Sequence, residues 1–193
     1  MIDQKDFVEI QKHMDLFDRI RDDVIKKSRD VVKLSKQIIY SVHRDEIHKA
    51  EKLKEKIKIS LGELVGMTKE HNALYYSGSL KVAEQEFVEA LVFLEFVKNK
   101  SLPSFEELNV QIENYLLGLC DLTGELVRRA INCSIKENFD DAVAAKNAVS
   151  EIYDQLMQFD FRNGELRRKF DSIKYDLKKL EDLVLQLKLK DKV

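Results

Sequence analysis

The sequence predicts an all-α protein, with one domain over residues 1–193 folded as an antiparallel bundle of six or seven helices. Only 1 Pro and 6 Gly occur in 193 residues, so few positions would interrupt a helix. Charged residues make up 35% of the chain and hydrophobic residues 44%, a mixture typical of long amphipathic helices. Apolar residues recur every three or four positions, and no stretch of useful length alternates with a period of two. We therefore expect a helical content above about 70%.

Two long helices are predicted in the first part of the chain. The first covers residues 3–44, where apolar side chains three to four positions apart would share one face, among them Phe7, Ile10, Met14 and Phe17. The second covers residues 46–70 and shows the same spacing. The segment 71–79, HNALYYSGS, breaks the pattern and is predicted to form a loop.

The middle of the chain is predicted to hold two more helices. A strongly apolar one covers residues 80–99. Beyond it, Ser104 followed three residues later by Glu107 matches a capping box, so another helix should begin directly after the serine. Helical pattern then continues over 105–136, with a bend near Asn114.

Two further helices are predicted to complete the bundle. The first covers residues 140–159 and is followed by Asn163-Gly164, a pair typical of a helix end and turn. The second covers residues 165–189.

The net charge of −2 indicates no particular class of partner, but the charges are unevenly distributed. Residues 26–60 hold 11 basic against 5 acidic side chains, a net charge of +6. Residues 84–125 hold 9 acidic against 2 basic side chains, a net charge of −7. From charge alone, the ordinary interpretation of both segments is a solvated helix face.

The cysteines and the N-terminal sequence indicate a soluble, cytoplasmic protein. Cys120 and Cys133 lie in apolar helical sequence without a Cys-x-x-Cys or Cys/His zinc spacing, so we expect buried thiols in a reducing compartment. The first residues, MIDQKDFVEI, do not form a signal peptide. No apolar run approaches the ~18–20 residues that span a bilayer, so no membrane partner is expected.

Two of the predicted helices carry carboxylates at positions where a core would hold leucine. Glu86 and Glu89 lie about 60° apart around their helix, among apolar neighbours. Asp121 and Glu125 lie about 40° apart on a second helix that is otherwise mostly apolar. Glycines at 118 and 124 would permit these helices, assumed antiparallel, to approach closely.

Buried carboxylates need cations or water, since burial without a partner costs several kcal/mol or raises the pKa. Four of them predict a site for a hard divalent cation, Mg²⁺ or Mn²⁺. Two alternatives stay open: the acids face solvent, or they pair with Arg128, Arg129 and Lys98. A di-iron site is disfavoured because the Glu-x-x-His pairs of such bundles are missing.

Three segments resemble the translin and Trax family, and Trax in particular. The segment 115–132, YLLGLCDLTGELVRRAIN, is very similar to the Trax signature with its uninterrupted DLTGEL. Upstream, QEFVEALVF at 85–93 resembles the Trax Q-E-Y-V-E-A segment, whose paired acids translin lacks. KKSRDVVKLSKQIIYSVHR at 26–44 resembles the first helix of the family. The similarity spans roughly residues 20–189, with the blocks in the same order and spacing.

The resemblance implies a bundle of about seven helices that assembles into a closed barrel, an octamer in other members. It also implies a Mg²⁺-dependent ribonuclease site, and the family's acidic residues fall on Glu86, Glu89, Asp121 and Glu125. The Trax insertions between the third and fifth helices and its basic nuclear-targeting tail are missing. The compact chain therefore resembles an archaeal member that works without a separate translin partner.

Together with these observations, the resemblance implies an endoribonuclease that binds and cleaves single-stranded RNA inside a homo-oligomeric barrel, with single-stranded DNA as a second candidate ligand. Phosphate contacts are expected from Arg44, His43, Arg128 and Arg129, with the basic segment 26–60. The alternatives are a non-catalytic binder of single-stranded nucleic acid and a structural helical adaptor.

Overall fold

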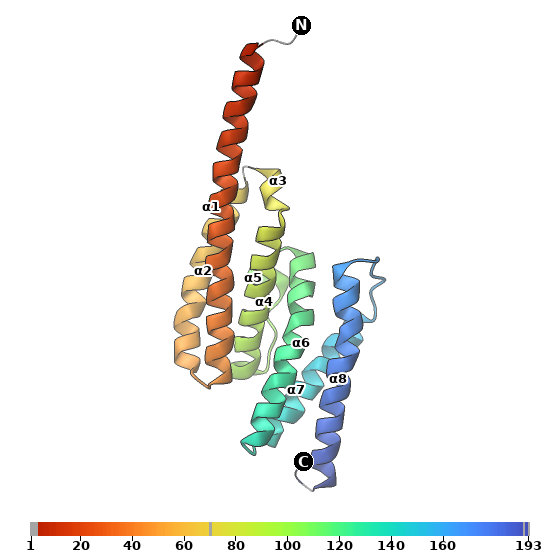
Figure 1. The fold of residues 1–193 in the computed structure, drawn as a ribbon. Coiled ribbons are helices and arrows are strands. Elements are labelled where there is room, and N and C mark those ends of the chain that lie inside the picture. Colours follow the sequence, from red (N-terminus) through yellow and green to blue (C-terminus); the bar gives the residue numbers. More distant parts are fainter. Residues whose placement is uncertain (1–3, 70, 191, 193) are drawn as a thin grey trace.

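Helices dominate the computed structural model, which describes residues 4–69, 71–190 and 192. About 85% of these residues are helical, which confirms the expected all-α fold, and no strand occurs among them (Figure 1). The helices are α1 (Gln4–His43), α2 (Ile47–Lys69), α3 (Asn72–Tyr75), α4 (Gly78–Asn99), α5 (Phe105–Leu108), α6 (Ile112–Ile135), α7 (Phe139–Leu156) and α8 (Glu165–Leu189). No helix in this part of the chain is long and apolar enough to cross a membrane.

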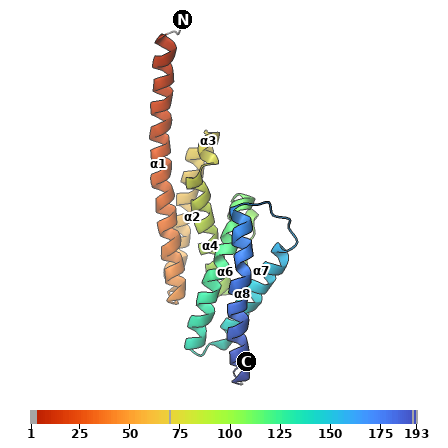
Figure 2. The same ribbon diagram turned by 45° about the vertical axis from the view of Figure 1, so that its right-hand side comes forward.

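The six long helices form two groups of three. Helices α1, α2 and α4 pack on one another, as do α6, α7 and α8, and the α4–α6 contact joins the groups (Figures 1 and 2). Helix α4 lies between α1 and α6, and its buried face includes the large core residues Phe87, Phe93 and Leu94. Cys120 and Cys133 are buried free thiols, as the sequence predicts. The N-terminal part of α1 extends beyond the other helices (Figure 1).

The capping box at the start of α5 confirms the prediction from the sequence, but the helix that follows is short. The Ser104 hydroxyl accepts from the amide of Glu107, and the Ser104 amide donates to the Glu107 carboxylate at 2.7 Å. One turn later Asn109 adopts a left-handed conformation with φ 53°, which asparagine tolerates better than most residues and which ends the helix. The single helix predicted over 105–136 is therefore two helices, broken at 109–111 rather than bent at Asn114.

Other predicted boundaries differ by a few residues. The predicted loop 71–79 contains the single-turn helix α3, and α4 begins two residues earlier than expected. The helix predicted over 140–159 ends at Leu156, while the last helix has the predicted bounds. The first residue of the helix predicted at 3–44 and the last residue of the one predicted at 46–70 lie outside the described residues.

Helices α4 and α6 run parallel, so the antiparallel arrangement assumed for this pair was wrong. Lys81 near the start of α4 contacts Glu113 near the start of α6 at 3.1 Å. One turn further along α4, Gln85 donates to Asp121 of α6. The connection that contains α5 returns the chain along the bundle before α6 begins, which makes the parallel packing possible (Figure 1).

A buried carboxylate anchors the start of α6 on α4. Glu84, only 2% exposed, accepts from the Asn114 side chain at 2.7 Å and from the Gln111 amide at 3.2 Å. Burial raises the pKa of Glu84, and these two hydrogen bonds oppose that effect. The register between α4 and α6 is thereby fixed at their first turns.

Gly118 permits the close approach of the two helices. A Cβ atom at this position would lie 2.6 Å from Cβ of Val88 and 2.8 Å from the backbone oxygen of Gln85. Gly124 was expected to serve the same purpose, but it is exposed and a Cβ there would meet nothing within 4 Å. Only the first of the two glycines is therefore required by the α4–α6 packing.

The two glycines predict opposite effects of the same substitution. Gly118→Ala should lower the free energy of unfolding by about 1–3 kcal/mol, because the new methyl group overlaps α4. Gly124→Ala should raise it by about 0.5–1 kcal/mol, because alanine has the higher helix propensity and the position is open. Urea denaturation followed by circular dichroism measures both. Equal effects of the two variants would contradict the close contact at Gly118.

Candidate functional site

Three of the four predicted acidic residues line one pocket, which we call the acidic pocket. Its volume is about 310 Å³. Glu86 and Glu89 reach it from α4, and Glu125 reaches it from α6. The remaining lining residues are Lys36, Ile39 and Tyr40 of α1 and Arg128 of α6. The parallel packing of α4 and α6 thus brings together acids that lie up to 39 positions apart, between 86 and 125.

The fourth acid, Asp121, is bound by residues outside the acidic pocket. Both of its carboxylate oxygens accept from the Lys169 ammonium of α8 at 2.6 Å. The Gln85 amide also donates to it. Asp121 is still close enough for its charge to raise the pKa of Glu86 and of Glu89. It therefore belongs to the same electrostatic cluster, although its side chain is held by α8.

Glu125 is held by a buried histidine. The Nε2 atom of His43, at the end of α1, is hydrogen-bonded to the carboxylate of Glu125. Nδ1 of His43 is buried and has no partner among the described residues, and the ring packs on Phe93 with centroids 4.8 Å apart. A neutral ring that donates through Nε2 leaves only an acceptor unpaired there, so this tautomer fits the surroundings best. His43 therefore orients Glu125.

Glu89 has the most strongly perturbed pKa of the cluster. It is mostly buried and forms no hydrogen bond or ion pair within the described part of the chain. Burial raises its pKa to about 8, with further contributions from the negative charges of Asp121, Glu86 and Glu125. Burial also raises the pKa of Glu86, an effect that the charge of Lys36 opposes. A carboxyl group that titrates near neutral pH is typical of functional sites.

The donor chemistry of the cluster fits a hard divalent cation, but the present arrangement is not a complete ligand set. Carboxylate oxygens are the ligands that Mg²⁺ and Mn²⁺ prefer. Within residues 4–69, 71–190 and 192, no three His, Cys, Asp or Glu side chains are placed to hold one ion. The reason is that Asp121 is engaged by Lys169, and Glu125 by His43. Binding a metal would require these side chains to reorient toward Glu86 and Glu89.

Most of the cations considered from the sequence as partners of the four acids pair with other residues. Of the three considered from the sequence, only Arg128 reaches the cluster, 3.7 Å from Glu125. Lys98 pairs with Glu51 at 2.6 Å. Arg128 is therefore the one cation of these three that faces the acidic pocket.

Two of the four residues predicted to contact nucleic acid are exposed. Arg128 is half exposed at the rim of the acidic pocket, with its guanidinium 5.7 Å from the centre of the Tyr40 ring. Arg44 is exposed on the α1–α2 side and pairs with Glu46 at 2.9 Å. Both remain available to a ligand.

The other two residues predicted to contact nucleic acid, His43 and Arg129, are buried and bound to acidic side chains. His43 is buried against Glu125. Arg129 is 7% exposed and binds Asp45 at 2.6 Å and Asp141 at 3.6 Å. Consecutive residues of a helix point about 100° apart, so Arg128 faces the acidic pocket while Arg129 faces the core.

Sequence reasoning missed four residues around the acids. Lys36 and Tyr40, four positions apart on α1, share a face of the helix and line the acidic pocket. The basic character of segment 26–60 was a signal for the first of them. Lys169 and Gln85 contact Asp121, and no local pattern marks them, because their proximity follows from packing between helices.

A family model for the translin family matches residues 19–191. The chain belongs to the translin family. An uncharacterised protein of Methanocaldococcus jannaschii is 31% identical over 161 residues, covering 80% of this chain and 70% of the relative. Translin-associated protein X of Mus musculus is 26% identical, covering 94% of this chain and 76% of the relative.

A solved structure shows the same fold. The structure described as AfC3PO in complex with duplex RNA superposes with a TM-score of 0.87 and 25% identity. The match covers 95% of this chain and 97% of that chain. The arrangement of helices that forms the acidic pocket is therefore a property of the translin fold as well as of this sequence.

The raised pKa of Glu89 predicts a specific pH dependence of stability. The ordinary pKa of a glutamate is 4.5, and that of Glu89 in the folded protein is about 8. Between these two pH values, Glu89 keeps a proton in the folded protein that it has released in the unfolded chain. The free energy of unfolding should therefore fall as pH rises through this range. In metal-free protein, Glu89→Gln should match the wild type near pH 4.5 and exceed it above pH 8 by an amount on the order of a few kcal/mol.

Thermal unfolding across pH 4.5–9 measures this difference. Glu55→Gln, which removes the same charge from an exposed position on α2, serves as the control and should change stability by less than about 0.5 kcal/mol. Identical pH profiles for the wild type and Glu89→Gln would contradict the assignment of Glu89 as the perturbed carboxyl.

Proposed function

We propose that this translin-family protein is a Mg²⁺- or Mn²⁺-dependent endoribonuclease that acts on single-stranded RNA. The observation that carries the proposal is the acidic pocket, where Glu86, Glu89 and Glu125 meet beside cationic side chains. A divalent cation held by these acids, with Asp121 on release from Lys169, would supply an activated water and neutralise charge on the phosphate.

The residues of the chain have separable tasks in this proposal. Lys36 and Arg128, at the rim of the acidic pocket, bind the substrate phosphates. Glu89, with a pKa of about 8, accepts or holds a proton near neutral pH, as a general base must. His43 keeps Glu125 turned toward the pocket through its Nε2 hydrogen bond. Apolar Ile39 forms part of the wall and limits access of water.

A solved structure of the same fold supports RNA as the ligand, and the exposed part of α1 supports an assembly. A translin-family structure is described as a complex with duplex RNA, so the fold accommodates RNA. The segment of α1 that extends beyond the bundle exposes Phe7, Ile10 and Met14, which supports burial against further copies of the chain. The proposed assembly is a closed homo-oligomer, an octamer, with the cleavage sites inside.

One observation favours a second candidate, a non-catalytic binder of single-stranded nucleic acid. Asp121 and Glu125 already have cationic or histidine partners, and a set of three free ligands is not assembled among the described residues. In this alternative, Lys169 and His43 are permanent partners of the acids. Metal-dependent cleavage distinguishes the two candidates.

Charge-removing substitutions in the cluster should abolish cleavage. Glu89→Gln and Asp121→Asn keep the size of each side chain, so RNA binding and oligomer size should stay near wild type. Cleavage of labelled single-stranded RNA in Mg²⁺ should fall by at least about 100-fold. Glu95→Gln, on α4 but paired with Lys54 outside the acidic pocket, should cleave at the wild-type rate. Wild-type activity in either cluster variant would exclude the proposed site.

Metal binding should stabilise the fold through the same residues. A ligand that binds only the folded state adds about 2.7 kcal/mol at a concentration 100 times its Kd, so Mn²⁺ should raise the Tm of the wild type. The increase should be much smaller for Glu89→Gln and unchanged for Glu95→Gln. If the Tm of the wild type does not respond to Mn²⁺ or Mg²⁺, the acids do not hold a metal and the non-catalytic candidate is favoured.

A further inference from the structure

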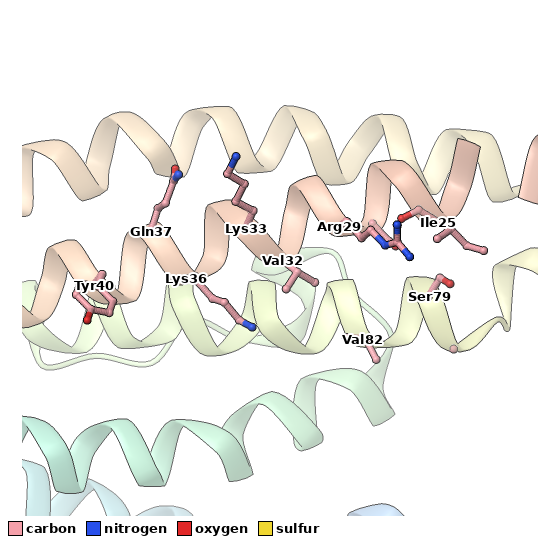
Figure 3. Close-up of a pocket in the computed structure, with 11 residues that line it drawn as sticks. Ile25, Arg29, Val32, Lys33, Lys36, Gln37, Tyr40, Ser79 and Val82 are labelled. Atoms are coloured by element: carbon pink, nitrogen blue, oxygen red, sulfur yellow. The ribbon is translucent and has the colours of Figure 1, made fainter. Parts of the chain in front are cut away.

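A second pocket, larger than the acidic pocket, lies along α1. This α1 groove has a volume of about 790 Å³. It is lined by Ile25, Ser28, Arg29, Val32, Lys33, Lys36, Gln37 and Tyr40 of α1 and by Gly78, Ser79 and Val82 at the start of α4 (Figure 3).

The rim of the α1 groove is cationic and lacks acidic partners. Arg29 and Lys33 form no ion pair with any residue that the structure describes, and Lys36 has none within 4 Å. Figure 3 shows Lys36 directed toward α4, Lys33 directed to the other side of α1 and Arg29 along the helix. Helix geometry places the first and last of these residues about 10 Å apart along the axis, so three positive charges are distributed along α1, on both of its sides.

The walls of the α1 groove are largely apolar. Ile25 and Val32 of α1 face the groove together with Val82 of α4. A ligand that fits must therefore combine negative charges at regular spacing with apolar or aromatic surface. A nucleic acid strand has this chemistry, because phosphates alternate with bases whose faces stack on apolar and aromatic side chains.

Tyr40 connects the α1 groove with the acidic pocket. This side chain is 61% exposed and lines both pockets, as does Lys36. Tyr40 also lines a third pocket, of about 360 Å³, that includes Arg44. An exposed aromatic ring at the junction of a cationic groove and an acidic pocket is placed to stack a base next to the phosphodiester in that pocket.

We propose that the α1 groove binds the RNA strand adjacent to the cleaved phosphodiester, with phosphates on Arg29 and Lys33 and an unpaired base on Tyr40. The proposal rests on the proposed function only for the role of the acidic pocket. Its preference for a single strand follows from the stacking step, since bases inside a duplex are already stacked on one another.

A competing occupant of the α1 groove is the extended N-terminal part of α1 from a second copy of the chain. Its exposed residues Phe7, Ile10 and Met14 are apolar and would match the walls of the α1 groove. The same segment also carries acidic side chains, at positions 6, 9, 15 and 18, so it would bring carboxylates to the groove as RNA brings phosphates. The continuity of the α1 groove with the acidic pocket, through Lys36 and Tyr40, favours RNA, and the oligomeric state is the measurement that exposes the other occupant.

The first experiment measures binding of labelled single-stranded RNA in EDTA over a series of salt concentrations. Arg29→Gln/Lys33→Gln should weaken binding and lower the slope of log affinity against log salt by about 1.4, from about 0.7 per phosphate lost. The matched control is Lys52→Gln/Lys56→Gln, which removes two charges four positions apart from an exposed face of α2. The control should keep the wild-type slope.

The second experiment, also in EDTA, tests whether an RNA base stacks on Tyr40. The RNA carries the fluorescent base 2-aminopurine at one position. Stacking quenches its fluorescence, so the wild type and Tyr40→Phe should quench it at one position of the strand. Tyr40→Leu should restore the fluorescence and weaken single-strand binding by about tenfold or more, with a smaller effect on a blunt duplex. A merely structural role would not separate the phenylalanine from the leucine variant.

The outcomes are distinguishable from failure of the nuclease proposal, because EDTA removes metal-dependent cleavage from both measurements. The α1 groove proposal is overturned if the Arg29/Lys33 variant keeps the wild-type slope, or if Tyr40→Leu quenches like the wild type. It is also overturned if the Arg29/Lys33 variant changes oligomer size by light scattering while RNA affinity stays constant. The Arg29/Lys33 variant can lower the slope of log affinity against log salt even if the wild type never cleaves RNA. That result supports RNA binding in the α1 groove and rejects only the proposed nuclease activity.

Discussion

The close packing of α4 on α6 at Gly118 is the constraint on which the candidate site depends. At this point the backbone of α6 approaches Val88 and the backbone of α4 more closely than any side chain would permit. The contact joins the two groups of three helices, and it places Glu86 and Glu89 on one side of an interface opposite Asp121 and Glu125. A wider spacing would fill the interface with apolar side chains and separate the carboxylates.

This packing concentrates negative charge where solvent is largely excluded, and the surrounding helices compensate for it unequally. Lys169 from α8 neutralises Asp121, and His43 from α1 binds Glu125. Glu89 has no such partner, and it holds a proton at neutral pH instead. A core that served stability alone would carry leucine there, and a buried acid without a partner is typical of functional sites.

Sequence reasoning succeeded where the deciding interactions are local. The spacing of apolar residues predicted the long helices, the capping box of Ser104 lies where expected, and the four acids do form one electrostatic cluster. It failed where the outcome depends on packing between distant segments. The parallel direction of α4 and α6 follows from the connection that contains α5, and the burial of Arg129 follows from its pairing with Asp45. Neither has a signature within a few residues of the chain.

Helix α1 shows how one element can close the site and also present a surface to a ligand. Its buried face carries the small residues Ser28, Ser35 and Ser41, which let α1 lie close to its neighbours in the bundle. The first two bond the backbone oxygens of Ile25 at 2.8 Å and Val31 at 3.1 Å, so their burial leaves no hydroxyl unpaired.

Because α1 lies this close to α4, the side chains of the adjoining face extend over the interface instead of into solvent alone. Lys36 and Tyr40 thereby reach the acidic pocket, while Arg29 and Lys33 on the same helix stay free of acidic partners. Positive charge thus leads along α1 to a cluster of carboxylates at one end of a continuous face. A polyanion attracted by the positive charge along α1 would be held next to the carboxylates, which repel it. A divalent cation between the polyanion and the carboxylates would offset that repulsion.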